Sequence, residues 1–140
     1  MARISGQFRA GSPPLPTITA LVTIPRLRKE RPVEFLIDTG ADATTLHPID
    51  TRLMGIRPLH FVGIPRAMMY GVGGNAQYWE EVAELRFLHD DGDYWDVVTL
   101  PIHVAVPTRA NSAIESLLGR DVIGLYRFTC EALAGILTFE

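Results

Sequence analysis

Residues 35–42 read FLIDTGAD and place an aspartate directly after an apolar run. The segment 32–37 predicts a β-strand whose last residues are buried on both faces. A carboxylate at the end of such a strand is costly unless its charge is used or hydrogen-bonded. Gly40 permits a turn that larger residues resist, and its amide can approach the Asp38 carboxylate, while Thr39 offers a hydroxyl beside it. The sequence therefore predicts that Asp38, Thr39 and Gly40 form a tight turn that holds the carboxylate.

The rest of the chain has the frequent turn-forming residues that are typical of an all-β protein. Ten prolines and twelve glycines divide it into short segments, several of them rich in β-branched residues. An Asp-Gly pair in the turn 89–93 is a strong hairpin signal between two longer strands. In addition to 32–37, the pattern predicts strands over 15–24, 77–88 and 94–106.

Two segments have helical features. Residues 47–54 predict a short turn of helix, and residues 111–118 predict a better one, with a polar N-cap and a glutamate in the first turn. The tail, residues 125–140, predicts two short strands around residues 132–135. We find no internal repeat and no low-complexity segment.

Length and composition favour one globular domain over residues 1–140. Apolar residues make up 47% of the chain and charged residues 21%, which suits a protein with a real core and excludes a disordered one. The formal net charge of −3 argues against a nucleic-acid partner. The basic run at 26–31 contains a glutamate and is interpreted as a solvated turn between strands.

Several residue types predict no special chemistry. The single cysteine, Cys130, cannot form an internal disulfide and is expected to be buried and inert. The four histidines show no metal-ligand spacing and are expected in surface or half-buried structural roles. Trp79 and Trp95 are expected in the core, although Tyr78 or Trp79 could instead line a substrate pocket.

The expected location is the cytoplasm. No apolar stretch is long enough to span a membrane, and the first residues lack the apolar core of a signal peptide. We therefore expect no membrane partner.

Three motifs in a fixed order resemble the retropepsins, the aspartic proteases of the retroviral type. The first is Asp38-Thr39-Gly40, continued by Ala41 and Asp42; the resemblance implies that Asp38, Thr39 and Gly40 are the catalytic residues. The second is a glycine-rich segment, MMYGVGGN at 68–75, which is similar to the flap hairpin of that family. The third is LLGRD at 117–121, which matches the family pattern of two apolar residues, Gly, Arg and Asp or Asn near the C-terminus.

The resemblance implies a half of an acid-protease β-barrel, closed or partly open, with a flap hairpin and one short C-terminal helix. It also implies an aspartic endopeptidase that needs no metal or organic cofactor and cleaves peptides without a covalent intermediate. Two facing carboxylates share one proton, and together they activate a water and protonate the leaving nitrogen. Asp91-Gly92 lacks a preceding apolar strand, so the second carboxylate must come from a second molecule. A two-fold homodimer with Asp38 of each subunit on its axis supplies it.

The resemblance further implies roles for residues around the triplet. Thr39 would lock the two catalytic loops together across the axis, and Ala41 and Asp42 would contact the substrate backbone. Arg120 would pair with Asp42 and brace the loop, and Gly119 would let the chain pass close behind it. Substrate-binding and flap residues are expected at Tyr70, Gly71, Val72, Gly73 and Gly74.

The chain departs from the family in its tail, which is longer than in the smallest viral members. The strand that builds the dimer interface is therefore left open, and with Met1 at the start we expect a free-standing cellular or bacterial relative. Two other functions also stay open: a catalytically silent dimeric module that binds peptides or supports assembly, and a small-molecule-binding barrel. For the protease we expect highest activity at mildly acidic pH and apolar residues on both sides of the cut.

Overall fold

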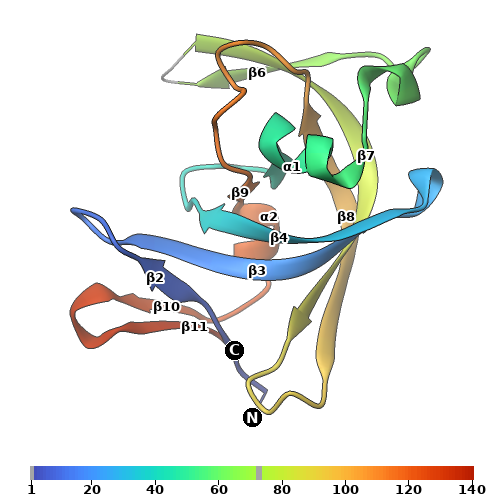
Figure 1. Cartoon of the computed structure of the whole chain (residues 1–140). Helices are drawn as coiled ribbons and strands as arrows, with labels where there is room; N and C mark the ends of the chain where they lie inside the picture. Colours follow the sequence, from blue (N-terminus) through green and yellow to red (C-terminus); the bar gives the residue numbers. More distant parts are fainter. Residues whose placement is uncertain (1, 72–73) are drawn as a thin grey trace.

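The structure is a computed structural model that describes residues 2–71 and 74–140. Strands dominate it, as predicted (Figure 1). The strands are β1 (Ile4–Ser5), β2 (Gln7–Arg9), β3 (Leu15–Ile24), β4 (Lys29–Ile37), β5 (Thr45–Leu46), β6 (Ala67–Gly71), β7 (Gly74–Leu88), β8 (Trp95–Ala105), β9 (Leu117–Leu118), β10 (Phe128–Glu131) and β11 (Ile136–Phe139). The α-helices are α1 (Pro48–Met54) and α2 (Arg120–Ile123), and short 3₁₀ turns lie at η1 (Pro25–Leu27), η2 (Pro58–Phe61) and η3 (Ala132–Ala134).

The larger sheet has eight strands in the order β2-β3-β4-β9-β5-β8-β7-β6. β7 also pairs with β3, which lies near the other end of this order, so the sheet closes on itself. Closure pairs backbone groups that an open sheet would leave at its edges. The observed architecture is the predicted all-β barrel.

The β3–β4 hairpin forms because both strands alternate apolar and polar side chains. Val33, Phe35 and Ile37 point into the core, each 7% exposed or less, while the residues between them are more exposed. The turn between them is η1 with Arg28, which has the left-handed conformation at φ 53°. The interpretation of the basic run at 26–31 as a turn is therefore confirmed for residues 26–28 and wrong for residues 29–31, which pair with β3 as the first residues of β4.

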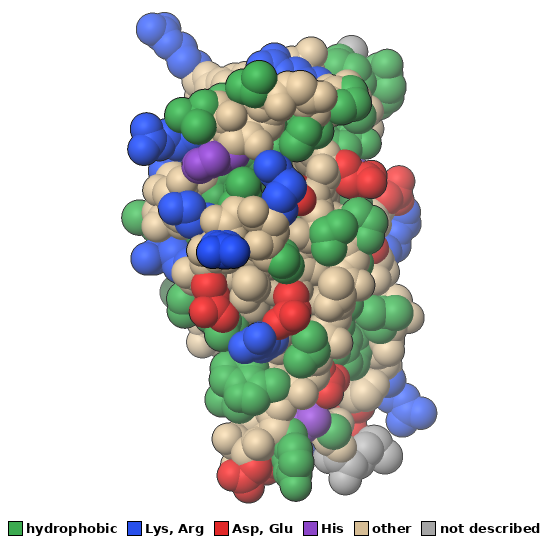
Figure 2. Space-filling model, turned by 90° about the vertical axis from the view of Figure 1, so that its right-hand side faces the viewer, with side chains coloured by type: hydrophobic (Ala, Val, Ile, Leu, Met, Phe, Trp, Pro, Cys, Tyr) green, Lys and Arg blue, Asp and Glu red, His purple; other side chains and the backbone are tan. Residues whose placement is uncertain are grey.

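The predicted long hairpin is formed by β7 and β8, and the two tryptophans differ in burial. Trp79 is 3% exposed and stacks on Phe61 in the core, as expected. Trp95 is 49% exposed, so its assignment to the core is wrong. It lies near the turn, on the outer face of β8, where alternation turns it away from the barrel. Figure 2 shows the side of the molecule that lies on the right in Figure 1, where apolar side chains are interspersed with charged ones.

The tail forms a second, three-stranded sheet in the order β1-β11-β10. The two short strands predicted around residues 132–135 are confirmed as β10 and β11, joined through η3. Cys130 lies in β10 but is exposed, which corrects the expectation of a buried thiol. β10 is an edge strand of this small sheet, and Cys130 does not face the core.

The helix expected over residues 111–118 is wrong. Asn111 accepts a hydrogen bond from the Thr108 amide at 2.8 Å and donates one to the Val106 carbonyl at 2.9 Å, which closes a turn instead of capping a helix. The last two residues of the segment form β9 beside β4, and Leu118 is fully buried there. Tertiary pairing thus outweighs a weak helical pattern. A short helix, α2, instead starts at Arg120, where the sequence analysis expected none.

One cluster of buried apolar residues joins the two sheets. It runs from Ile4 in β1 through the barrel strands to Leu137 and Phe139 in β11. The predicted turn of helix at residues 47–54 is confirmed as α1, which buries Met54 in the same cluster. None of the helices in the described part of the chain is long and apolar enough to cross a membrane.

Candidate active site

The Asp38 loop begins where β4 ends. The Asp38 amide donates to the Leu118 carbonyl at 3.0 Å, which extends the pairing of β4 with β9 into the loop. The Gly40 amide donates to Asp38 Oδ1 at 2.9 Å, and the Ala41 amide donates to the Asp38 carbonyl at 3.2 Å. These bonds hold the half-buried carboxylate in a tight turn, as the sequence led us to expect. Thr39 is exposed at the tip of this turn.

The chain around Gly119 supports this loop from behind. A side-chain carbon on Gly119 would lie 2.6 Å from the carbonyl carbon of Ala43 and 2.9 Å from the Thr44 nitrogen. Only glycine therefore allows this close passage. The Arg120 amide then donates to the Ala41 carbonyl at 2.8 Å, which fixes the two segments side by side.

Asp121, to which the sequence analysis gave no role, also holds the loop. Its carboxylate accepts hydrogen bonds from the Thr44 amide at 2.9 Å and the Thr44 hydroxyl at 2.7 Å. The same hydroxyl accepts from the Gly119 amide at 3.1 Å. The available signal was the position of Asp121 in the LLGRD motif, but the sequence does not show that Thr44 is its partner.

Arg120 and Asp42 form the expected ion pair, but at the surface. Their side chains are 58% and 86% exposed. An exposed pair of this kind contributes about 0–1 kcal/mol to stability. In the single chain, bracing of the loop therefore comes mainly from Asp121 and the backbone bonds.

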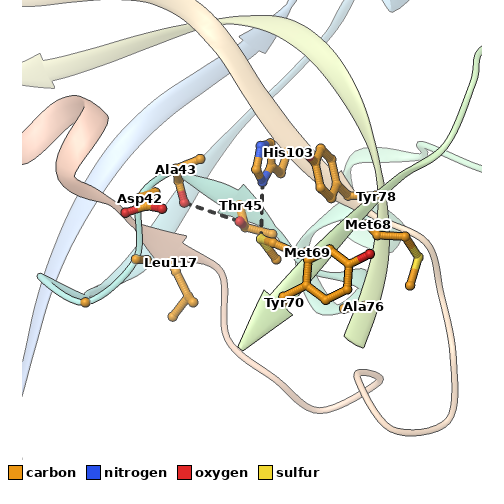
Figure 3. A pocket seen from close by; sticks show the side chains of 12 residues that line it. Asp42, Ala43, Thr45, Met68, Met69, Tyr70, Ala76, Tyr78, His103 and Leu117 are labelled. Atoms are coloured by element: carbon orange, nitrogen blue, oxygen red, sulfur yellow. Dashed lines mark hydrogen bonds between the residues drawn. The ribbon is translucent and has the colours of Figure 1, made fainter. Parts of the chain in front are cut away.

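A cleft of about 510 Å³ lies between this loop and the β6–β7 hairpin. Figure 3 shows side chains from both elements pointing into it. From the loop and the neighbouring β-strands come Gly40, Ala41, Asp42, Ala43, Thr45, His103 and Leu117, and from the hairpin come Met68, Met69, Tyr70, Ala76 and Tyr78. The structure thus brings four predicted site residues, Gly40, Ala41, Asp42 and Tyr70, to one cleft.

The glycine-rich segment joins the two strands of the hairpin. Gly71 ends β6 and Gly74 begins β7, and the two are paired across the ladder. Tyr70 is 77% exposed beside them. Val72 and Gly73, also predicted as flap residues, lie outside the described residues.

The cleft wall contains a histidine that the sequence analysis placed in a structural role. His103 stacks on Tyr78 with ring centroids 3.6 Å apart, and its Nδ1 lies 3.3 Å from the sulfur of Met69 (Figure 3). Burial lowers the pKa of His103, and the charges of Glu80 and Asp121 partly oppose this. In β8, His103 lies between the buried Ile102 and Val104 and faces away from them, but only the fold shows that it faces a cleft.

The closed barrel, the DTG turn at the end of β4 and the cleft beneath a β-hairpin define a retropepsin-like fold. Solved structures confirm this assignment. The chain is similar to a retropepsin-like aspartic protease from Rickettsia conorii, with a TM-score of 0.58 and 14% identity over 97% of this chain and 95% of that one. It is also similar to the EIAV protease complexed with the inhibitor HBY-793, with a TM-score of 0.52 and 21% identity over 79% of this chain and 86% of that one. Likeness at this level of identity establishes the fold.

Comparison by sequence finds no matching family model and no matching curated protein. The resemblance to the retropepsins is thus confirmed by the similarity of three-dimensional structures and not by a match in sequence.

Proposed function

We propose that this chain is an aspartic endopeptidase that acts as a homodimer. The observation that carries the proposal is the position of Asp38. On a fold shared with aspartic proteases, its half-buried carboxylate accepts the Gly40 amide at 2.9 Å, and the residues that follow in the same loop, Gly40 to Ala43, line a cleft of about 510 Å³. A carboxylate held by hydrogen bonds in a loop that borders a cavity suits general acid–base chemistry.

The second carboxylate would come from Asp38 of the partner subunit. The chain has one Asp-Thr-Gly triplet, and a two-fold axis beside it would bring two copies of Asp38 together. Two carboxylates at short range share one proton, because both cannot ionise easily. The ionised member would take a proton from the attacking water, while the protonated member would hydrogen-bond the substrate carbonyl and then protonate the leaving nitrogen. Thr39, exposed at the tip of the turn, is available to bond across the axis.

The peptide would lie in the cleft under the β6–β7 hairpin. Asp42 and Ala41 line the cleft on the loop side, where they would contact the substrate backbone. Tyr70 lines it on the hairpin side, and the segment 70–74 would act as the flap that closes over the peptide and excludes water. Because a single core joins both sheets, we propose that the 140 residues act as one domain.

The test is cleavage of a mixed peptide library at several pH values, with products identified by mass spectrometry. The proteins compared are the wild type, Asp38→Asn and the control Asp91→Asn, whose carboxylate lies in the exposed turn after β7. We expect cuts with the wild type and the control, strongest at mildly acidic pH. Loss of the acid–base pair should lower the rate with Asp38→Asn by at least about a hundredfold.

Equal cleavage by Asp38→Asn would overturn the proposal. No cleavage by a wild-type protein shown to be dimeric would also overturn it, and would favour the catalytically silent peptide-binding or assembly module.

A further inference from the structure

One patch of the cleft differs from the apolar wall expected for a general peptide groove. It is formed by Thr45 of β5, Met69 of β6, Tyr78 of β7 and His103 of β8. The imidazole of His103 and the ring of Tyr78 stack at an interplanar angle of 18°, so β7 and β8 hold the histidine from one side. Figure 3 shows Met69 across from it.

The contact between His103 and Met69 defines the donor at this patch. A thioether sulfur can only accept a hydrogen bond, and it accepts weakly. In the tautomer of His103 that makes this contact a hydrogen bond, the proton is on Nδ1, 3.3 Å from that sulfur. A strong donor thus faces the cleft with a weak acceptor as its partner, and Met69 is a flexible, unbranched side chain that can move aside.

We propose that His103 Nδ1–H is a specificity-determining group of this cleft, and that the patch takes a substrate side chain with an amide, Gln or Asn. The amide oxygen would replace the Met69 sulfur as the acceptor. This inference rests on the proposed protease function for its role, although the binding it describes does not require cleavage.

Charge favours an amide over a carboxylate at this patch. Asp42 lines the same cleft, Glu80 lies on β7 and Asp121 lies behind the loop, and the charges of Glu80 and Asp121 act on His103. A substrate carboxylate would meet these like charges. A lysine side chain would have to lose its hydration beside a partly buried ring. A neutral amide side chain avoids both costs, and its oxygen still accepts the hydrogen bond from His103 Nδ1–H.

The first test uses the peptide library with wild type, His103→Leu and His103→Asn. We expect wild-type cleavage sites to be enriched about three- to tenfold in Gln and Asn at one position near the cut, which is the discrimination that one hydrogen bond provides. His103→Leu should lose the enrichment and cleave peptides with Leu there instead. His103→Asn, which keeps a donor, should retain part of it. His60→Leu, outside the cleft, is the matched control and should leave the preference unchanged.

A second variant removes the competing acceptor. Met69→Leu frees Nδ1–H, so the preference for Gln and Asn should persist or increase. A preference that disappears with Met69→Leu but persists with His103→Leu would overturn the proposal, as would enrichment in Lys or Glu.

A retention assay separates this inference from the proposed catalysis. Library peptides are passed over immobilised Asp38→Asn protein with His103 or with Leu at position 103, and retained peptides are identified by mass spectrometry. Enrichment in Gln and Asn only with His103 supports the inference even if the wild type cleaves nothing. Identical peptides on both proteins, or none on either, overturn it.

Discussion

At the scale of the residue, Gly119 decides whether the Asp38 loop and the α2 segment can lie together. Its φ of −97° is open to any residue, so backbone conformation does not explain the glycine. The restriction is steric, because the neighbours of a new side chain would be the backbone of Ala43 and Thr44. Backbone at the end of a hydrogen-bonded loop cannot move away as a flexible side chain can.

Gly119→Ala should therefore destabilise the protein by about 1–3 kcal/mol, as overpacking does in well-packed interiors. Urea unfolding followed by circular dichroism measures this. The control is Gly92→Ala in the turn after β7, where φ is +80° but nothing lies within 4 Å of the new carbon. That change should cost only the strain of a left-handed alanine, about 1 kcal/mol. A smaller loss at Gly119 than at Gly92 would contradict the steric explanation.

At the scale of the element, the segment after β8 is attached to α1 by a buried polar network. The Ser116 hydroxyl accepts from the His47 amide at 3.0 Å and donates to the Asp50 carboxylate at 2.5 Å. His47 Nδ1 also lies 2.7 Å from the Glu115 carbonyl. These bonds fix the approach to β9, and through β9 the strand that carries Asp38.

Ser116→Ala should cost about 1–3 kcal/mol, because the buried His47 amide would lose its partner. Ser112→Ala is the matched control. Ser112 is exposed and donates only to the Arg109 carbonyl, so its loss should change stability by less than about 0.5 kcal/mol. Thermal unfolding of both variants beside the wild type checks this, and equal melting temperatures for the two variants would refute the role of the network.

At the scale of the whole molecule, the proposed enzyme needs two chains for one site. Wild-type and Asp38→Asn chains that exchange freely should form mixed dimers with one intact carboxylate. In an equal mixture, only about one quarter of the dimers would carry both carboxylates. Cleavage should then fall to roughly a quarter of the rate given by wild-type protein at the same total concentration. A rate of one half would mean that each chain works alone.

The pH dependence of stability is a second property of the whole molecule. Burial lowers the pKa of His47, opposed by the Glu115 carbonyl and Asp50, and burial lowers the pKa of His103 in the same way. Below the ordinary histidine value of about 6.5, the unfolded chain therefore binds more protons than the folded one. The stability that neutral His47 and His103 contribute is fully present above about pH 6.5. It is lost as the pH falls through the lower pKa values that these histidines have in the folded protein.

Urea unfolding between pH 7.5 and pH 5 should show this decline. His47→Gln should make it shallower, because a side chain that cannot titrate no longer contributes to the slope. An unchanged slope in that variant would assign the decline to other groups. Because proteolysis is expected at mildly acidic pH, activity and stability should have different optima.

Local sequence determined much of this protein. The existence of the four long strands β3, β4, β7 and β8, the Asp-Gly turn at 89–93, α1 and the tail hairpin all follow from residues close in the chain, because strand and turn propensities are local properties. The tight Asp38-Thr39-Gly40 turn was foreseen for the same reason. The bond from the Gly40 amide to the Asp38 carboxylate spans only two residues.

Tertiary structure decided the rest. Residues 117–118 form a strand because they pair with β4. Asp121 stabilises the Asp38 loop because its carboxylate accepts the Thr44 amide. The exposure of Trp95 and Cys130, and the position of His103 at the cleft, depend on which neighbours cover each strand. These outcomes depend on contacts between segments far apart in the sequence, and such contacts leave no periodic pattern in either segment alone.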